Sequence, residues 1–253
     1  MIKFFRKIRQ NLLSEGKTGK YFKYALGEII LVVIGILIAL SINNWNEKRK
    51  LEKQERVYYC KIKEDLETDI INILEAKESL EKRVVSSKNT LSKLYNGNYD
   101  RTAIMEDYFS ATRSTDFFPS KSAIQDITSS GKLENLKLSE FKEAVINHYT
   151  DVESHMYVII SNRNESDKYL FSYDSFSELG IQKTDLYKSV FGEELLNQMS
   201  GFNWTKNKEH RIYKQFENNM VLSIIISTRE LQVLDFIMNS TKQLKYKLES
   251  FCD

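Results

Sequence analysis

The chain is poor in the residues that interrupt helices and in those that crosslink small folds. Its 253 residues include one proline, nine glycines and two cysteines. So few turn-forming residues, together with 28% charged side chains, argue against a β-sandwich, a collagen-like chain and a disordered linker. Two cysteines exclude a disulfide-dense scaffold and a four-cysteine zinc site. The composition therefore predicts an all-α protein.

The sequence also lacks an excess of positive charge outside its N-terminus. Residues 1–45 carry seven basic and two acidic side chains, whereas the remaining 208 residues carry 30 basic and 33 acidic ones. A nucleic-acid-binding domain needs an excess of cations on its folded part. We therefore expect no nucleic-acid partner.

Catalytic motifs are absent as well: the sequence has no Gly-x-Ser-x-Gly, no GxxxxGK[ST] phosphate loop and no His-Glu-x-x-His. The one candidate set of metal ligands is His148, Asp151 and His155, at positions i, i+3 and i+7 of an expected helix. Three such residues also occur on solvated helix faces that bind nothing. We expect no metal, no other cofactor and no catalytic residue, and hence no enzyme.

The most apolar stretch is residues 26–42, where 12 of 17 residues are Leu, Ile or Val. Their insertion into a bilayer is favourable by roughly 5 kcal/mol, whereas Glu28 opposes it by at most about 3 kcal/mol. Aromatic side chains of the kind found at membrane interfaces bracket the stretch: Tyr21, Tyr24 and Trp45. The sequence predicts a transmembrane helix over residues 21–45, with the lipid bilayer as partner.

Three alternatives to this anchor stay open. The stretch can be the buried core helix of a soluble protein, or a signal peptide cleaved near Ala39-Leu40-Ser41. The span can also have the reverse orientation, because basic residues follow it at positions 48–50. The larger basic excess before the span favours a cytoplasmic N-terminus, with residues 1–20 as a basic amphipathic segment on the inner leaflet.

The run FFRKIRQNLLSEGKTGKYFKYALGEIILVVIGILIALSINNWNE resembles the N-terminal signature of a bacterial family of single-span membrane proteins, domain of unknown function 6090. The resemblance is dense over residues 1–47 and looser beyond, where residues 129–133 (SSGKL) and His148-Tyr149 fit the family's general pattern. It implies membrane anchoring in a Gram-negative type of bacterium. With the orientation favoured above, we expect an inner-membrane anchor and a periplasmic domain. It brings no known activity.

The expected span has one face of small and polar residues. Gly35 and Ala39 form a small-xxx-small pair that lets two helix backbones approach closely, and Glu28 and Asn43 fall near the same face. The alternatives are association through this face and a lone anchor with incidental small residues.

No glycine or proline occurs between Gly35 and Gly97, so one helix is expected to run from the membrane to Tyr95. Lys63, Lys77 and Ser87 interrupt its apolar stripe, which argues against a clean two-stranded coiled coil. Neighbouring apolar residues are expected to widen the stripe, as in a helix packed in a bundle: Ile62, Ile71, Leu74 and Val85.

Further helices are expected at residues 102–131, 137–170 and 206–250, with short helices and loops over 172–205. The segment 102–131 divides into two short helices, with Pro119 in the first turn of the second and Gly131 at its C-terminal cap. Alternating up and down, these elements predict an extracytoplasmic antiparallel helical bundle over residues 46–253. If 102–131 traverses the bundle, Cys60 and Cys252 end at the same level and can pair; otherwise both stay unpaired.

Two functions are compared. The first is a membrane-anchored interaction or scaffold protein, oligomeric through self-association or bound to another membrane protein. The alternative is a sensory module in which a ligand bound in the bundle alters the span. Such a module needs a cytoplasmic part that passes the signal on, and residues 1–20 are too few to form a domain for this. A metal-dependent enzyme using the His148 face is the third and least favoured.

Overall fold

The computed structural model describes residues 18–252, except 98–99, 114, 137–138 and 200–201, and it is all-α. Within these residues there is no β-strand. The chain divides into two compact units, residues 1–57 and 58–253. Most of the predicted cytoplasmic segment, residues 1–20, lies outside the described part of the chain.

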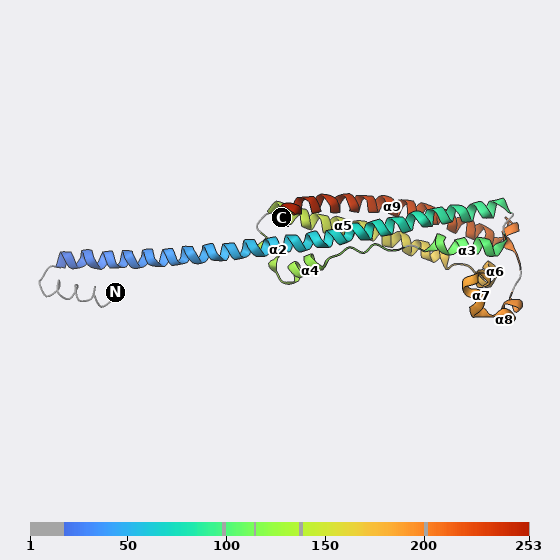
Figure 1. The fold of residues 1–253 in the computed structure, drawn as a ribbon, viewed down its shortest axis with the longest axis horizontal. Helices are drawn as coiled ribbons and strands as arrows, with labels where there is room; N and C mark the ends of the chain where they lie inside the picture. Colours follow the sequence, from blue (N-terminus) through green and yellow to red (C-terminus); the bar gives the residue numbers. More distant parts are fainter. Residues whose placement is uncertain (1–17, 98–99, 114, 137–138, 200–201, 253) are drawn as a thin grey trace. The chain divides into compact units, whose positions relative to one another are not determined.

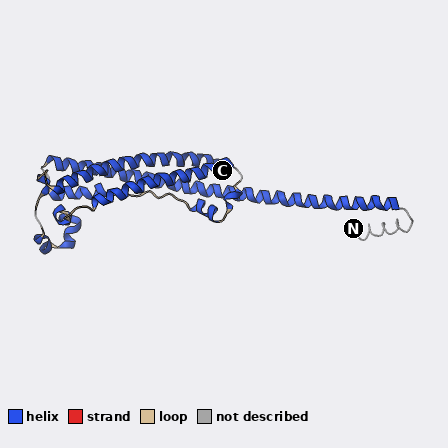
Figure 2. Cartoon of the chain, turned by 180° about the vertical axis from the view of Figure 1, so that it is seen from behind, coloured by secondary structure: helices blue, strands red, loops and turns tan. Residues whose placement is uncertain are grey.

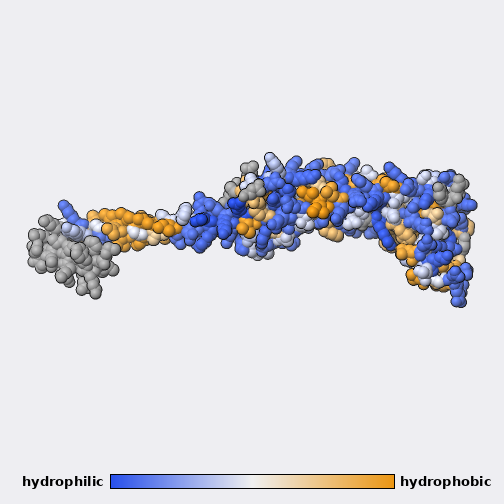
Figure 3. Space-filling model, in the orientation of Figure 1, coloured by the Kyte–Doolittle hydropathy of each residue, from blue (hydrophilic) through white to orange (hydrophobic). Residues whose placement is uncertain are grey.

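Helix α2 runs without interruption over Thr18–Asn96, as the absence of glycine and proline after Gly35 predicted. In the first unit it carries an 18-residue window of mean hydropathy 2.7, none of which is buried, and its length and composition are sufficient to cross a membrane. Figure 3 shows this part of α2 as a nearly continuous hydrophobic surface. Since a core helix of a soluble protein is mostly buried, this exposure disfavours the buried-core alternative.

The second unit is built on α2, α5 (Ser139–Leu170) and α9 (Arg211–Cys252), which lie side by side (Figures 1 and 2). Contacts between α5 and α9 show that the two helices are antiparallel. Tyr169 contacts Asn219 at one end of the pair, and His148 contacts Ser240 further along. The predicted long helices at 137–170 and 206–250 are therefore confirmed, although α9 begins five residues later than expected.

A fourth segment runs along the bundle beside α2, α5 and α9. It consists of two short helices, α3 (Arg101–Thr112) and α4 (Ser122–Ser129), followed by the 3-10 turn η1 (Lys132–Asn135). As this segment proceeds, its contacts with α2 move toward the N-terminal end of that helix. The Thr115 N–H donates to Ser79 Oγ, the Ser120 N–H to Asp69 Oδ1, and the Ala123 N–H to Asp65 Oδ2. The segment thus crosses the bundle antiparallel to α2, as two short helices.

The two cap predictions for α4 had different outcomes. Gly131 follows the C-cap Ser130 with φ +67°, the left-handed geometry that favours glycine after a helix, so that prediction is confirmed. The prediction for Pro119 was wrong, because α4 begins only at Ser122 and Pro119 lies in the preceding extended segment. The carboxylate of Asp65 accepts from Ser122 Oγ at 2.7 Å, so a residue of α2 fixes where α4 starts.

Burial along the second-unit part of α2 alternates every three and four residues, but the buried seam is narrower than expected. Ile62 is buried, whereas Ile71, Leu74 and Val85 are more than half exposed, so the predicted wide stripe was wrong there. Polar side chains occupy several buried positions instead. The seam comprises Tyr59, Ile62, Leu66, Asp69, Ile73, Ala76, Leu80, Arg83, Ser87, Thr90 and Leu94.

Polar residues of this seam bind the backbone of the last turn of α3. The Arg83 Nε–H donates to Ser223 Oγ at 3.0 Å and to the Ala111 carbonyl at 3.3 Å. Ser87 and Ser223 hydroxyls also reach that carbonyl. Because the chain leaves the helical state at residue 113, its last carbonyls need donors, and the seam supplies them.

The remaining elements form a small lobe, which we define as residues 173–206. It contains α6 (Phe176–Leu179), η2 (Ile181–Lys183), α7 (Asp185–Phe191), α8 (Glu193–Gln198) and η3 (Trp204–Lys206). In Figure 1, α6, α7 and α8 lie beside α3, at the end of the bundle opposite the C-terminus. The predicted short helices and loops over 172–205 are confirmed.

Candidate functional site

The three candidate metal ligands lie on α5 but do not form a metal site. His148 is buried against α9, with Nδ1 2.7 Å from Ser240 Oγ, and burial lowers its pKa to about 4, so the ring is neutral. His155 Nδ1 instead lies 2.7 Å from the backbone carbonyl of Asp151, on the exposed side. Across the described residues, no group of three or more His, Cys, Asp or Glu side chains is placed to hold a metal ion.

The predicted association face of the span lies entirely on the first-unit part of α2. Gly35, Ala39 and Asn43 are exposed, and a Cβ built on Gly35 meets nothing within 4 Å. A single chain therefore leaves room for another helix backbone along this face. Glu28 lies on the same side and is partly buried.

The cysteines lie at one end of the second unit. Cys60 of α2 and Cys252 of α9 are joined by a disulfide, with their Cα atoms 5.5 Å apart. Of the two arrangements that the sequence left open, the structure has the bonded one. The nearby aromatic rings of Tyr59, Phe141 and Phe251 pack against one another with centroids 4.6–6.1 Å apart.

The lobe is held against α3 by one arginine and one glycine. The Arg101 guanidinium, at the start of α3, donates to the carbonyls of Glu178 and Phe202 through Nη1. Gly180 has φ +97°, and a Cβ there would lie 2.5 Å from Arg101 Nε. Only glycine combines that backbone geometry with the close passage of the arginine.

The lobe also has a buried anchor and a local cap. Trp204 is fully buried and donates its indole N–H to the Leu179 carbonyl at 3.2 Å. At the start of α6, Ser175 Oγ accepts the Glu178 N–H at 3.2 Å, which is the N-cap geometry of a helix. These bonds fix the backbone that carries the lobe's exposed side chains.

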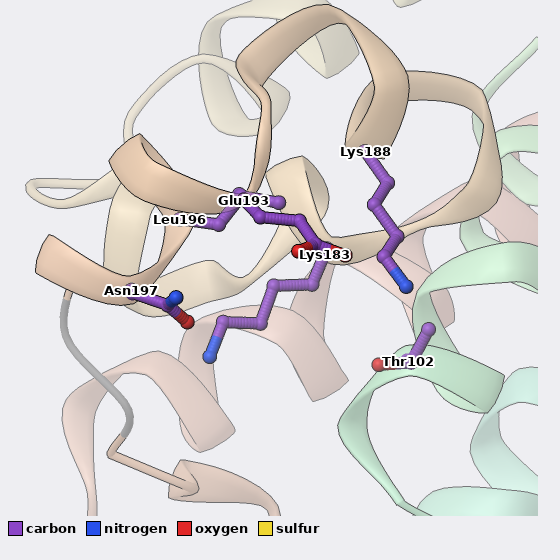
Figure 4. A pocket seen from close by; sticks show the side chains of 6 residues that line it. All are labelled: Thr102, Lys183, Lys188, Glu193, Leu196 and Asn197. Atoms are coloured by element: carbon purple, nitrogen blue, oxygen red, sulfur yellow. The ribbon is translucent and has the colours of Figure 1, made fainter.

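A cleft of about 480 Å³ lies where η2, α7 and α8 meet α3. It is lined by Thr102, Lys183, Lys188, Glu193, Leu196 and Asn197. Figure 4 shows the two lysine side chains ending at opposite sides of the cleft, Lys183 beside Asn197 and Lys188 beside Thr102. Two ammonium groups, an amide, a hydroxyl and one carboxylate can therefore contact a small polar ligand.

A second hollow of about 320 Å³ is mostly apolar. Its lining includes Phe176, Ile181, Tyr187, Phe191 and Met199. Helix α7 contributes to both hollows, because Tyr187 and Phe191 face the apolar one while Lys188 faces the cleft. The Tyr187 ring also packs on Phe109 of α3, with centroids 5.6 Å apart.

Sequence reasoning did not identify the cleft residues. Lys183 and Lys188 are five positions apart in a weakly patterned stretch, and Thr102 is some eighty residues earlier. No spacing rule brings them together, since their proximity depends on how the lobe folds back onto α3. The stretch of residues 169–176 is rich in aromatic residues and contributes Phe176 to the apolar hollow.

Comparison with known proteins gives one match. The profile of a family of unknown function, DUF6090, matches residues 28–188, more than half of the chain. The match begins within the predicted span and ends in α7. It therefore supports the family named in the sequence analysis, but it does not include residues 1–27 and lies mostly beyond residue 47, where the resemblance was looser. No curated protein and no solved structure matches the chain.

Proposed function

Since the chain belongs to the DUF6090 family, which has no assigned function, we propose its role from the structure. It is a membrane-anchored interaction protein. Residues 21–45 cross a bacterial inner membrane once, the N-terminus is cytoplasmic, and the helical bundle holds a protein partner on the periplasmic side. The role is non-enzymatic.

One observation carries this proposal: the unburied apolar segment and the first helix of the bundle are the same helix, α2. An exposed stretch of mean hydropathy 2.7 is unfavourable in water and favourable in lipid. On α2 the aromatic rings of Tyr24 and Trp45, which flank the apolar stretch, are also exposed, as expected for interfacial anchors.

The disulfide supports the proposed sidedness. Disulfides persist in the periplasm and are reduced in the cytosol, so a bonded Cys60–Cys252 pair fits a bundle outside the cytoplasm. The basic excess before the span favours the same orientation.

The lobe supports the interaction role. Helix α7 contains no buried residue, and Leu186 and Val190 on it are 56% and 77% exposed. Leu195 of α8 is also exposed. Exposed aliphatic side chains gathered on a short, well-anchored element are typical of protein-binding surfaces.

Site-specific photocrosslinking in native membranes tests the interaction role. A photoreactive residue replaces Val190 in one strain and Tyr246 in another; both side chains are about three-quarters exposed, but Tyr246 lies on α9 outside the lobe. The proposal predicts a discrete crosslinked product, identified by mass spectrometry, at position 190 and none at 246. Equal products at both positions, or none at 190, would contradict it.

Self-association through the span is tested separately. Replacing Gly35 with Ile fills the small-residue face, and we expect the chain to become more monomeric in liposomes, measured by energy transfer between labelled copies. Val33→Ile, on another face of the same helix, serves as the control. Unchanged energy transfer in both variants would indicate a lone anchor.

The two hollows of the lobe favour a second candidate function, a sensory ligand-binding module. A ligand that binds the folded lobe raises the unfolding temperature of the full chain by mass action. Thermal-shift screening of the chain in detergent distinguishes this function from pure partner binding, because an interaction protein without a ligand shows no concentration-dependent shift.

A further inference from the structure

The cleft between the lobe and α3 carries charges that no neighbouring group neutralises. Within the described part of the chain, Lys183 and Lys188 make no ion pair, whereas other lysines of the bundle do. Lys93 pairs with Asp107 at 2.8 Å and Lys121 with Glu153 at 2.6 Å. The two lysines of the cleft are therefore available to an external anion.

We propose that this cleft is a binding site for a small dicarboxylate, with one carboxylate at each lysine. Asn197 beside Lys183 and Thr102 beside Lys188 supply a neutral hydrogen-bonding partner next to each cation (Figure 4). Ammonium groups bind carboxylates by charge-assisted hydrogen bonds, and neighbouring amides and hydroxyls fix the orientation of such a ligand.

Glu193 makes the site selective among dicarboxylates. Its carboxylate lines the same cleft and forms no ion pair with either lysine. A ligand that carries an ammonium group as well as two carboxylates complements all three charges, and an acidic amino acid such as glutamate has this pattern. A dicarboxylate without the ammonium group, such as succinate, leaves Glu193 facing a like charge.

The backbone that presents these groups is already ordered. The Lys183 N–H donates to the Gly180 carbonyl at 3.1 Å, and the Lys188 N–H to the Thr184 carbonyl at 2.9 Å. Leu196 is buried at the base of the cleft, and Arg101 fixes the lobe to α3. The cleft volume of about 480 Å³ also falls in the range of about 300–1,000 Å³ that is usual for ligand sites.

This inference does not depend on the interaction role, because the crosslinking at position 190 can fail while the cleft still binds a ligand. The test is isothermal titration of the full chain in nanodiscs with L-glutamate, succinate and inorganic phosphate. We expect saturable binding, with an affinity that decreases from glutamate to succinate to phosphate. The affinity should be lower at higher salt concentration.

Matched variants assign the binding to the cleft. Lys183→Gln and Lys188→Gln each lower glutamate affinity about tenfold or more, and the double variant abolishes it. Lys206→Gln, which makes the same charge change on nearby η3 outside the cleft, leaves affinity unchanged. Glu193→Gln raises succinate affinity and narrows the preference for glutamate, an effect that a merely structural role would not produce.

Three results overturn the proposal. They are the absence of saturable binding with every probe, glutamate binding that survives in the double lysine variant, and phosphate binding as tight as that of the dicarboxylates. The unfolding temperature of each variant, measured in parallel, shows whether the lobe is still folded.

Discussion

Cys60, near the start of the bundle on α2, is bonded to Cys252, at the end of α9, across 192 residues of sequence. Because the chain runs along the bundle four times, through α2, the α3–α4 segment, α5 and α9, it ends at the same end of the bundle at which it began. The two sulfur atoms therefore meet. The bond thereby encloses α3 to α8 and nearly all of α9 in one covalent loop.

Breaking this disulfide is expected to destabilise the bundle. Closing so long a loop restricts the unfolded chain, and removal of such a bond typically costs about 2–5 kcal/mol. Urea unfolding of the full chain in detergent, followed by circular dichroism with and without reductant, measures the difference. A Cys60→Ser, Cys252→Ser double variant should be insensitive to reductant. Wild-type stability that stays constant after both thiols are freed would contradict the expectation.

Asp69 is expected to make the bundle less stable as pH rises. Its carboxyl is buried and accepts the Ser120 N–H at 2.7 Å, and burial raises its pKa from 3.8 to about 6. A carboxyl whose pKa is higher in the folded state than in the unfolded state stabilises the fold at pH values below the unfolded pKa. That stabilisation is lost as the pH rises through the folded-state pKa of about 6.

Asp69→Asn keeps an oxygen for the Ser120 N–H and removes the buried charge. We expect it to be more stable than the wild type by about 1–3 kcal/mol at pH 8, with little difference at about pH 3, below the unfolded pKa. The free energy of unfolding across this range measures the effect. A variant that is less stable than wild type at pH 8 would show that the charged carboxylate is needed there.

His148 is expected to have the opposite pH dependence. Burial lowers its pKa from 6.5 to about 4, so the folded state holds the neutral ring and loses stability as pH falls between these values. His148→Asn retains a partner for Ser240 and should reduce the loss of stability between pH 6.5 and 4.5 by about 1–3 kcal/mol. A loss of stability between these pH values that is as large in the variant as in the wild type would contradict the expectation.

Gly180→Ala is expected to detach the lobe from α3. The new Cβ would lie 2.5 Å from Arg101 Nε and would require φ +97°, so the arginine must give up its bonds to the lobe carbonyls. We expect a loss of about 2–4 kcal/mol, with faster hydrogen exchange over residues 175–206. Gly97→Ala, which has φ +70° but open space, should cost less and leave exchange in the lobe unchanged.

The sequence predicted the long helices because their apolar periodicity is continuous. In α5 and α9, apolar residues recur every three or four positions, and those that form the core are buried, among them Val145, Val152, Leu234 and Leu244. The apolar segment of α2 that is long enough to cross a membrane was likewise evident from its composition alone. These features are local, so a single sequence is sufficient to identify them.

Features that depend on tertiary contacts were missed. Asp69 and Arg83 occupy buried positions of α2 because neighbouring backbone needs their hydrogen bonds. Asp69 accepts from Ser120 in the segment after α3, and Arg83 donates to the Ala111 carbonyl in the last turn of α3. The ion pair between the partly buried Arg163 of α5 and the buried Glu230 of α9 was also missed, because it depends on how the two helices pack. The Lys183–Lys188 cleft depends on how the lobe packs on α3, which no spacing in the sequence encodes.

The central claim is that residues 21–45 stay in the bilayer and hold the bundle outside the cytoplasm. It is tested most directly by adding protease to spheroplasts that express the chain with different epitope tags at its two ends. The account predicts that the C-terminal tag is lost at once, while the N-terminal tag survives and stays in the carbonate-washed membrane pellet. A C-terminal tag protected until the membrane is lysed, or an N-terminal tag absent from the mature protein, would contradict it.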